Sequence, residues 1–260
     1  MLLPVPFRFL AVFLLVLPGS SLALGGPEGP TTHSTPAPSS IVVGFVGGLV
    51  RHDNPKHGPV QLAQRIRSTS SKDTYVEVFE NRHRSSAFKT VLRLLDLNRD
   101  GILSEEEKSH SRIILYGHSW GAAAAVLLAR DLKREHIPVL LTVQVDSVAK
   151  LWQNDAIIPD NVTEAANFYQ PHGLLHGRSQ IKAADPERTQ ILGNYLTDYS
   201  KVRVDCTAGL SWYDRYLTPG HAQSECDPNV WGKVEDLIRQ RLTPPVDTAS
   251  SHPEQPATQQ

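Results

Sequence analysis

A serine lies at the centre of the glycine-flanked pentapeptide Gly117-His118-Ser119-Trp120-Gly121. The apolar run before it, residues 112–116, predicts a buried strand, and the alanine-rich stretch 122–135 predicts a helix. A serine on so sharp a strand-to-helix turn exposes its hydroxyl for nucleophilic attack, and its neighbours must be small because strand and helix nearly touch. Ser119 is therefore predicted to be a catalytic nucleophile. The Trp120 N–H, at the start of the helix, is predicted to stabilise a developing oxyanion.

A serine nucleophile needs a general base, and a late histidine is the candidate. His221 lies after a predicted strand at 201–206 and before a predicted closing helix at 230–242. The preceding Pro219-Gly220 predicts a loop there. Two other histidines remain alternatives as the base: His172 and His176.

His118 is predicted to be a supporting residue and not the base, because its side chain should point away from the Ser119 hydroxyl. A base also needs an acid that fixes its tautomer. Asp146 ends the predicted strand 138–145, which follows the helix after Ser119. Since parallel strands place their carboxyl ends on one edge of a sheet, Asp146 and Ser119 should lie one strand apart. Two competitors for the acid remain: Asp160 and Asp185.

A second constellation lies before the nucleophile strand, at residues 96–107. It fits the spacing D-x-[DN]-x-[DN]-G-x₅-E and resembles an EF-hand calcium loop. The predicted ligands are the side chains or carbonyls of six residues, with Gly101 allowing the sharp turn: Asp96, Asn98, Asp100, Ile102, Ser104 and Glu107. Little chain is left for an exit helix. The loop enters the amino end of the nucleophile strand, so the calcium ion is expected to be structural and not catalytic.

Strand and helix patterns alternate from residue 41 to 242, which predicts an α/β domain with a mostly parallel sheet flanked by helices. Strands are expected at 41–46, 75–79, 112–116, 138–145, 165–169 and 201–206, and helices at 59–67, 85–95, 122–135 and 230–242.

On these residues the chain resembles the α/β-hydrolase superfamily, lipase, esterase and thioesterase branches included. The resemblance runs from Ile41 to about Leu242 and implies a compact version of that fold without the two usual first strands. It also implies that the loop after the first strand donates a second oxyanion N–H, assigned to Gly48 with Gly47 and Leu49 as neighbours. Some lipases and thioesterases take their acid from the strand that here ends at Asp146.

The segments at the two ends of the chain differ in character from the predicted domain, and the first of them predicts export. Residues 1–23 read as a signal peptide, residues 24–40 as a disordered linker and residues 243–260 as a disordered tail. The chain has 2 cysteines, Cys206 and Cys226, which fit a disulfide in an oxidising compartment, although two free thiols remain an alternative. The protein is therefore expected to be secreted or periplasmic.

The charge balance is close to neutral, with 26 Lys and Arg against 27 Asp and Glu and a net charge of −1. It offers no electrostatic reason to expect nucleic acid as a partner, and no membrane insertion is expected after signal removal. The leading prediction is a serine hydrolase that cleaves a small-molecule or lipid ester without a catalytic cofactor. Two alternatives stay open: a thioesterase or acyltransferase using the same residues, and a non-catalytic calcium-binding module. The substrate and oligomeric state are left undetermined.

Overall fold

The structure is a computed structural model that describes residues 38–110, 112–204, 206 and 219–242. The predicted signal peptide, most of the predicted linker and the predicted tail lie outside these residues. Ser40, the last residue of the predicted linker, is instead buried and begins the first strand. Within the described residues, no helix is long and apolar enough to cross a membrane.

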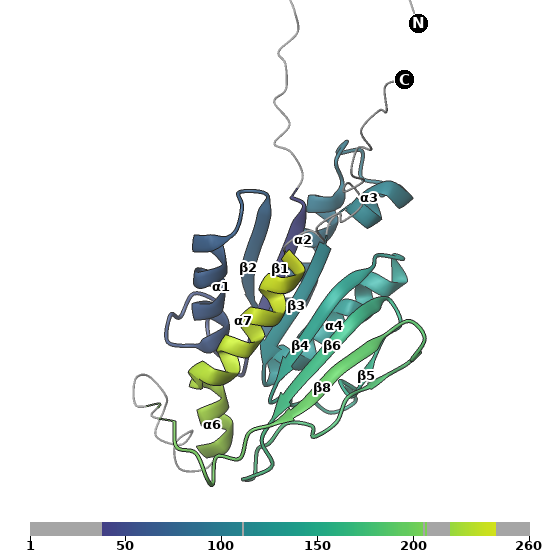
Figure 1. The fold of residues 1–260 in the computed structure, drawn as a ribbon. Helices are drawn as coiled ribbons and strands as arrows, with labels where there is room; N and C mark the ends of the chain where they lie inside the picture. The colour runs from purple at the N-terminus through teal and green to yellow at the C-terminus, as the bar shows by residue number, and fades with distance from the viewer. Residues whose placement is uncertain (1–37, 111, 205, 207–218, 243–260) are drawn as a thin grey trace, which may run out of the picture. The chain divides into compact units, whose positions relative to one another are not determined.

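A six-stranded sheet, in the order β2-β1-β3-β4-β6-β8, organises the described residues (Figure 1). Every neighbouring pair in it is parallel. The strands are β1 (Ser40–Val46), β2 (Thr74–Glu80), β3 (Arg112–His118), β4 (Val139–Val145), β6 (Val162–Tyr169) and β8 (Gln190–Leu196). A separate two-stranded sheet joins β5 (Ile157–Ile158) to β7 (Lys182–Ala183).

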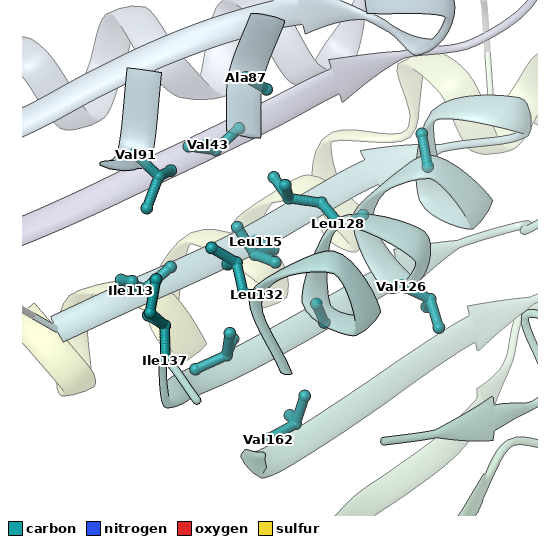
Figure 2. Packing of buried hydrophobic residues seen from close by; sticks show 14 of the residues in the cluster. Val43, Ala87, Val91, Ile113, Leu115, Val126, Leu128, Leu132, Ile137 and Val162 are labelled. Atoms are coloured by element: carbon teal, nitrogen blue, oxygen red, sulfur yellow. The ribbon is translucent and has the colours of Figure 1, made fainter. Parts of the chain in front are cut away.

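The central strands are buried on both faces, as the continuous apolar runs predict. Side chains of β1 alternate, so Val43 faces one core and Val42 the other. The first core packs against α2 (Arg84–Leu95) and α4 (Trp120–Arg134), as Figure 2 shows. The second packs against α1 (Gly58–Thr69) and α7 (Pro228–Leu242). Each fully buried Leu, Ile or Val side chain stabilises the fold by about 1.5–3 kcal/mol. The sheet can therefore hold the residues at its carboxyl edge in fixed positions.

One predicted strand is wrong. Residues 201–204 are irregular, and the last strand of the sheet is β8, earlier in the chain. Prediction missed β8 because it is an edge strand with Gly193 and Asn194 at its centre and only partly buried side chains, and so it lacks a strong apolar signal.

The predicted loop around His221 is also wrong. His221 lies in the first turn of α6 (Pro219–Cys226). Pro219 is the first residue of that helix, a position where its missing N–H costs nothing, so the proline that suggested a loop begins a helix. The short helix α3 (Glu105–His110) begins inside the 96–107 loop, at Glu105, and agrees with the short exit expected there.

This topology confirms the predicted α/β class: a parallel central sheet with helices on both faces. The order of the strands also puts the carboxyl ends of β1, β3 and β4 side by side on one edge. Segments that follow these three strands can therefore meet.

Candidate active site

Ser119 lies on the turn between β3 and α4 with φ +56° and ψ −126°. A non-glycine residue rarely adopts a positive φ, and the conformation is strained. The turn is as tight as the sequence predicts: a Cβ on Gly117 would lie 2.5 Å from the Gly121 carbonyl carbon, and one on Gly121 would lie 2.4 Å from the Phe45 oxygen. Only glycine therefore fits on either side of this turn.

The end of β1 lies against the same turn. A Cβ on Gly47 would lie 2.9 Å from the Ser119 Cβ and 3.0 Å from the His118 oxygen. Gly48 follows with φ +49°, a backbone conformation that glycine adopts without strain. The loop that the resemblance implicates in oxyanion binding thus lies next to the serine.

The structure brings Ser119, His221 and Asp146 together. The His221 Nε2 lies 2.9 Å from the Ser119 Oγ, and its Nδ1 lies 2.7 Å from the Asp146 Oδ2. A carboxylate only accepts hydrogen bonds, so the proton belongs on Nδ1 and the Nε2 lone pair faces the serine hydroxyl. This arrangement, the Ser119–His221–Asp146 triad, can take a proton from the serine during nucleophilic attack.

Asp146 is fully buried and held by more than His221. Its Oδ1 accepts a hydrogen bond of 2.5 Å from the Gly177 N–H, and its Oδ2 accepts one of 3.1 Å from the Gln170 Nε2. Gly177 must be glycine, because a Cβ there would lie 2.5 Å from the Asp146 Oδ1. Sequence reasoning missed both supporting residues, since neither belongs to a motif.

These surroundings set the protonation of the triad. Burial alone would raise the pKa of Asp146, but the hydrogen bond and charge of His221 outweigh burial and lower it. Burial lowers the pKa of His221, although the hydrogen bond that its Nδ1–H donates to Asp146 acts in the opposite direction. His221 is therefore neutral at neutral pH, the form in which a histidine can act as a base.

The competing acids and bases are engaged elsewhere. Asp160 forms an ion pair of 2.5 Å with Lys133, and Asp185 accepts a hydrogen bond from the Glu187 N–H in a turn. His172 pairs with Asp198 at 2.9 Å, and the His176 Nδ1 lies 3.1 Å from the Gly173 carbonyl. The structure brings none of these four candidates to Ser119 through a hydrogen bond.

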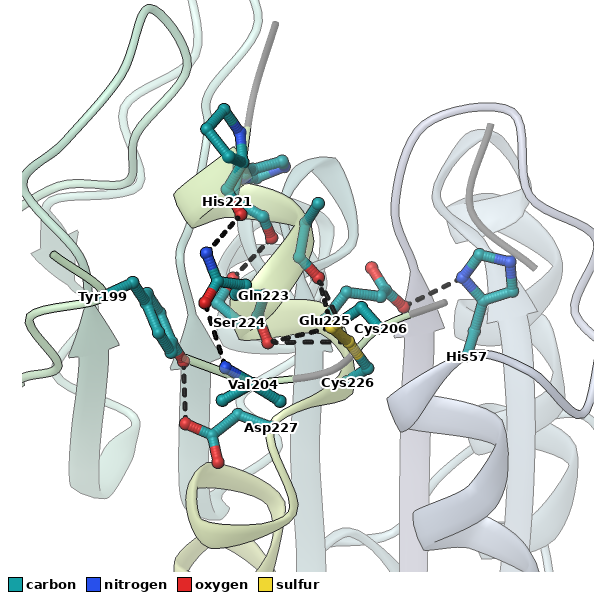
Figure 3. Close-up of a disulfide and its surroundings, with 12 residues drawn as sticks. His57, Tyr199, Val204, Cys206, His221, Gln223, Ser224, Glu225, Cys226 and Asp227 are labelled. Atoms are coloured by element: carbon teal, nitrogen blue, oxygen red, sulfur yellow. Dashed lines mark hydrogen bonds and ion pairs between the residues drawn. A yellow bond between two sulfur atoms is a disulfide. The ribbon is translucent and has the colours of Figure 1, made fainter. Parts of the chain in front are cut away.

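The His118 side chain lies in a buried cluster, with its Nε2 3.0 Å from the Ser224 Oγ. The His118 Nδ1 contacts the Glu225 carboxylate. The other oxygen of Glu225 lies 3.0 Å from the His57 Nδ1, as Figure 3 shows. All three residues of this His57–Glu225–His118 cluster are buried. The His118 ring lies 4.7 Å from the His221 ring, centroid to centroid. The cluster thus joins the nucleophile strand to the helix that carries His221.

Charge explains the pKa values in the cluster. Burial would lower the pKa of His118, but the Glu225 carboxylate outweighs burial and raises it. Burial would raise the pKa of Glu225, and the charge of His118 with the hydrogen bonds of both histidines lowers it instead. Sequence analysis missed Glu225. If α6 had been predicted as a helix, the four-residue spacing between His221 and Glu225 would have placed the two side chains next to each other on it.

Cys206 and Cys226 form a disulfide, shown in Figure 3. Cys226 is the last residue of α6, so the bond ties the helix of His221 to the chain that follows β8. In the same region the Tyr199 hydroxyl donates a hydrogen bond of 2.9 Å to the Asp227 Oδ2. These contacts hold α6 at the carboxyl edge of the sheet.

The two predicted oxyanion donors belong to segments that follow β3 and β1: Trp120 comes directly after Ser119, and Gly48 comes directly after Gly47, which lies against Ser119. Trp120 is the first residue of α4, so its N–H has no carbonyl partner within the helix. The Gly48 carbonyl accepts a hydrogen bond of 2.6 Å from the Asn81 Nδ2. Both N–H groups remain proposed donors.

The 96–107 loop folds around the Glu107 carboxylate. Its Oε1 accepts a hydrogen bond of 2.8 Å from the Leu97 N–H, and its Oε2 accepts one of 2.9 Å from the Ser104 N–H. As the side chains stand, the described residues contain no group of three or more His, Cys, Asp or Glu that could hold a metal ion. The Asp96 Oδ1 is nevertheless buried without a hydrogen-bond partner.

A pocket of about 580 Å³ opens beside the Asp146 end of the triad. Its walls come from residues 147–149, which follow β4, from Tyr169 and Pro171 at the end of β6, and from residues 176–180. Two aromatic residues near this edge of the sheet do not line the pocket: Phe168 is buried in the core and Trp152 is fully exposed.

The chain matches no family model and no curated protein. Solved structures do match. A dienelactone hydrolase from Anabaena variabilis has 13% identity over 78% of this chain and 85% of that chain, with a TM-score of 0.42. A cutinase-like protein from Cryptococcus sp. has 12% identity over 79% and 96%, with a TM-score of 0.39. Human thioesterase 2 has 10% identity over 78% and 96%, with a TM-score of 0.38. Likeness this low carries no argument about activity, so the chemistry must be argued from the site itself.

Proposed function

We propose that this protein is a serine hydrolase that cleaves carboxylic esters, with Ser119 as nucleophile, His221 as base and Asp146 as the acid that orients it. The observation that carries the proposal is the unbroken hydrogen-bond chain from the Ser119 Oγ through His221 to the buried Asp146. A strained serine at a strand-to-helix turn supports it.

The reaction follows from this geometry. The Ser119 oxygen attacks the ester carbonyl while His221 Nε2 takes the hydroxyl proton, and the Trp120 and Gly48 N–H groups stabilise the oxyanion. His221 returns the proton to the leaving alcohol. Water, deprotonated by His221, then cleaves the acyl-enzyme. No cofactor takes part.

Export from the cell is part of the proposal. It rests on the predicted signal peptide and is supported by the Cys206–Cys226 disulfide, because such bonds persist in oxidising compartments. The substrate is expected to be a small-molecule or lipid ester that reaches the pocket beside Asp146.

A fluorophosphonate probe tests the function, since it phosphonylates only an activated serine. We expect the wild-type protein to be labelled and the Ser119→Ala variant to remain unlabelled. Ser179→Ala is the matched control, because Ser179 lines the pocket beside Asp146, is exposed, and should leave labelling intact. A folded wild-type protein that resists the probe and turns over neither p-nitrophenyl esters nor thioesters would instead support a non-catalytic binding module.

We also propose that the 96–107 loop binds calcium in a structural role. The alternating oxygen side chains and the unpartnered Asp96 Oδ1 support this, since Ca²⁺ takes six to eight oxygen ligands. When bound, the ion would be held by Asp96, Asn98, Asp100 and Glu107 side chains, with the Ile102 carbonyl and Ser104. The loop precedes β3, whereas Ser119 follows it, so the ion would lie far from the triad along that strand.

Calcium should therefore raise thermal stability without changing turnover. At one hundred times its Kd it would add ~2.7 kcal/mol, and each kcal/mol raises the Tm by about 2–4 °C. Differential scanning calorimetry with Ca²⁺ or with EGTA measures this, with Glu107→Gln as the variant that should lose the response. A Tm that ignores Ca²⁺, or turnover that EGTA abolishes in the folded protein, would contradict the structural role.

A further inference from the structure

Asn81 forms hydrogen bonds with the loop at the end of β1, on both sides of Gly47. Its Nδ2 donates hydrogen bonds of 3.3 Å to the Val46 carbonyl and 2.6 Å to the Gly48 carbonyl. Asn81 follows β2 directly, and the register pairs Val46 with Glu80, so its side chain lies level with the loop it binds. Asn81 is buried, and the loop therefore has a fixed partner inside the protein.

Lys150 continues this contact across the sheet edge. Its Nζ donates a hydrogen bond of 2.9 Å to the Asn81 Oδ1 and lies 4.7 Å from the centroid of the Trp120 ring. Lys150 follows β4 and Asn81 follows β2, with β1 and β3 between them in the sheet. The contact thus spans the two strands whose ends carry Gly48 and Ser119.

We propose that Asn81 and Lys150 are positioning residues for the oxyanion site. The Gly48–Asn81–Lys150–Trp120 contacts, here called the oxyanion bridge, join the two residues whose N–H groups are the proposed donors. Asn81 fixes the orientation of the loop that includes the Gly48 peptide, and Lys150 ties that loop to the residue after the nucleophile. Preorganised donors stabilise a transition state because they need no reorganisation as charge develops. This inference rests on the proposed function.

The expected effect is on kcat and not on KM. A misplacement of about 1 Å at such a site costs on the order of a hundredfold in rate, so Asn81→Ala should lower kcat by roughly ten- to a hundredfold. Asn81→Asp should do the same, because a carboxylate cannot donate to the carbonyls of Val46 and Gly48. Lys150→Met removes only the Asn81 hydrogen bond and the charge and should lower kcat less, whereas Lys150→Arg should restore it.

The experiment measures p-nitrophenyl butyrate turnover and inhibition by butylboronic acid in the full chain. The boronate forms a tetrahedral adduct on serine, with an oxygen where the oxyanion would lie. We expect boronate affinity to fall in proportion to kcat while KM changes by less than about twofold. Calorimetry of each variant shows whether a lower kcat comes from a loss of folded protein. Lys150→Met tests the oxyanion bridge without changing a buried residue.

Two results would overturn the inference: wild-type kcat in both Asn81 variants, or a loss of kcat that equals the loss of folded protein. Fluorophosphonate labelling of Ser119 keeps this distinct from the proposed function. If the wild-type serine is labelled and the Asn81 variants react at the same rate, the bridge is wrong and the hydrolase proposal stands. If the wild type is not labelled, the hydrolase proposal itself fails.

Discussion

Replacing Asp146 with asparagine should lower kcat for p-nitrophenyl esters by about four orders of magnitude. The Gly177 N–H, 2.5 Å from Oδ1, would hold the amide oxygen at that position. The amide NH₂ would then replace Oδ2, facing the His221 Nδ1 at 2.7 Å. Because an NH₂ group donates, Nδ1 would have to accept, and the imidazole proton would move to Nε2. His221 could then no longer take the Ser119 proton.

Asp160→Asn is the matched control, because Asp160 was a competitor for the acid and instead pairs with Lys133. It should leave kcat within about twofold of wild type, since an exposed ion pair contributes at most about 1 kcal/mol to stability and nothing to the reaction. Steady-state kinetics with a melting curve of each variant decides the question. A fall of less than tenfold in Asp146→Asn, or an equal fall in both variants, would remove Asp146 from the proposed role.

Replacing Glu225 with glutamine should lower the free energy of unfolding by about 3 kcal/mol, because removing one partner of a buried ion pair leaves the other without its counter-charge. All three residues of the His57–Glu225–His118 cluster are buried, so water cannot replace the lost carboxylate. Urea unfolding with the disulfide intact measures the loss, and an unchanged m-value shows that the unfolded state is comparable.

The loss should depend on pH in a defined direction. The pKa of Glu225 is lowered from its ordinary 4.5, so its contribution is present above pH 4.5 and lost as pH falls through the lower folded value. The pKa of His118 is raised from 6.5, so its contribution is full below pH 6.5 and is lost as pH rises through the folded value. The difference between wild type and variant should therefore be largest between pH 4.5 and pH 6.5. It should shrink as the pH falls through the folded pKa of Glu225 and as the pH rises through the folded pKa of His118.

Glu235→Gln gives the comparison, since Glu235 pairs with Arg65 at 2.5 Å on the next helix but is partly exposed. That change should cost less than about 1 kcal/mol. Equal losses in the two variants would mean that burial of the His57–Glu225–His118 cluster contributes no stability of its own. A Glu225→Gln loss that does not decrease as the pH rises above 6.5 into the alkaline range would mean that charged His118 is not the partner that Glu225 stabilises.

Local pattern was enough to predict the strand, the turn and the helix around Ser119. Apolar runs report burial, and glycines on both sides of a serine report a backbone that leaves no room for a side chain. Topology extended this to Asp146, because parallel strands share one carboxyl edge. The same reasoning missed β8, because its exposed edge position weakens the apolar signal, and it placed the last strand at 201–206 instead. It also predicted a loop at His221, where the proline begins a helix.

The sequence by itself determined the fold class, the serine turn and a short set of candidates for acid and base. Only the tertiary structure decided among them, because the deciding contacts join residues far apart in the chain: His221 and Asp146 are separated by 75 positions and Glu225 and His57 by 168. Periodicity records which face of an element is buried, but it holds no information on which distant side chain lies opposite. Gln170, Gly177, Asn81 and Glu225 acquire their roles only when the sheet edge is assembled around Ser119.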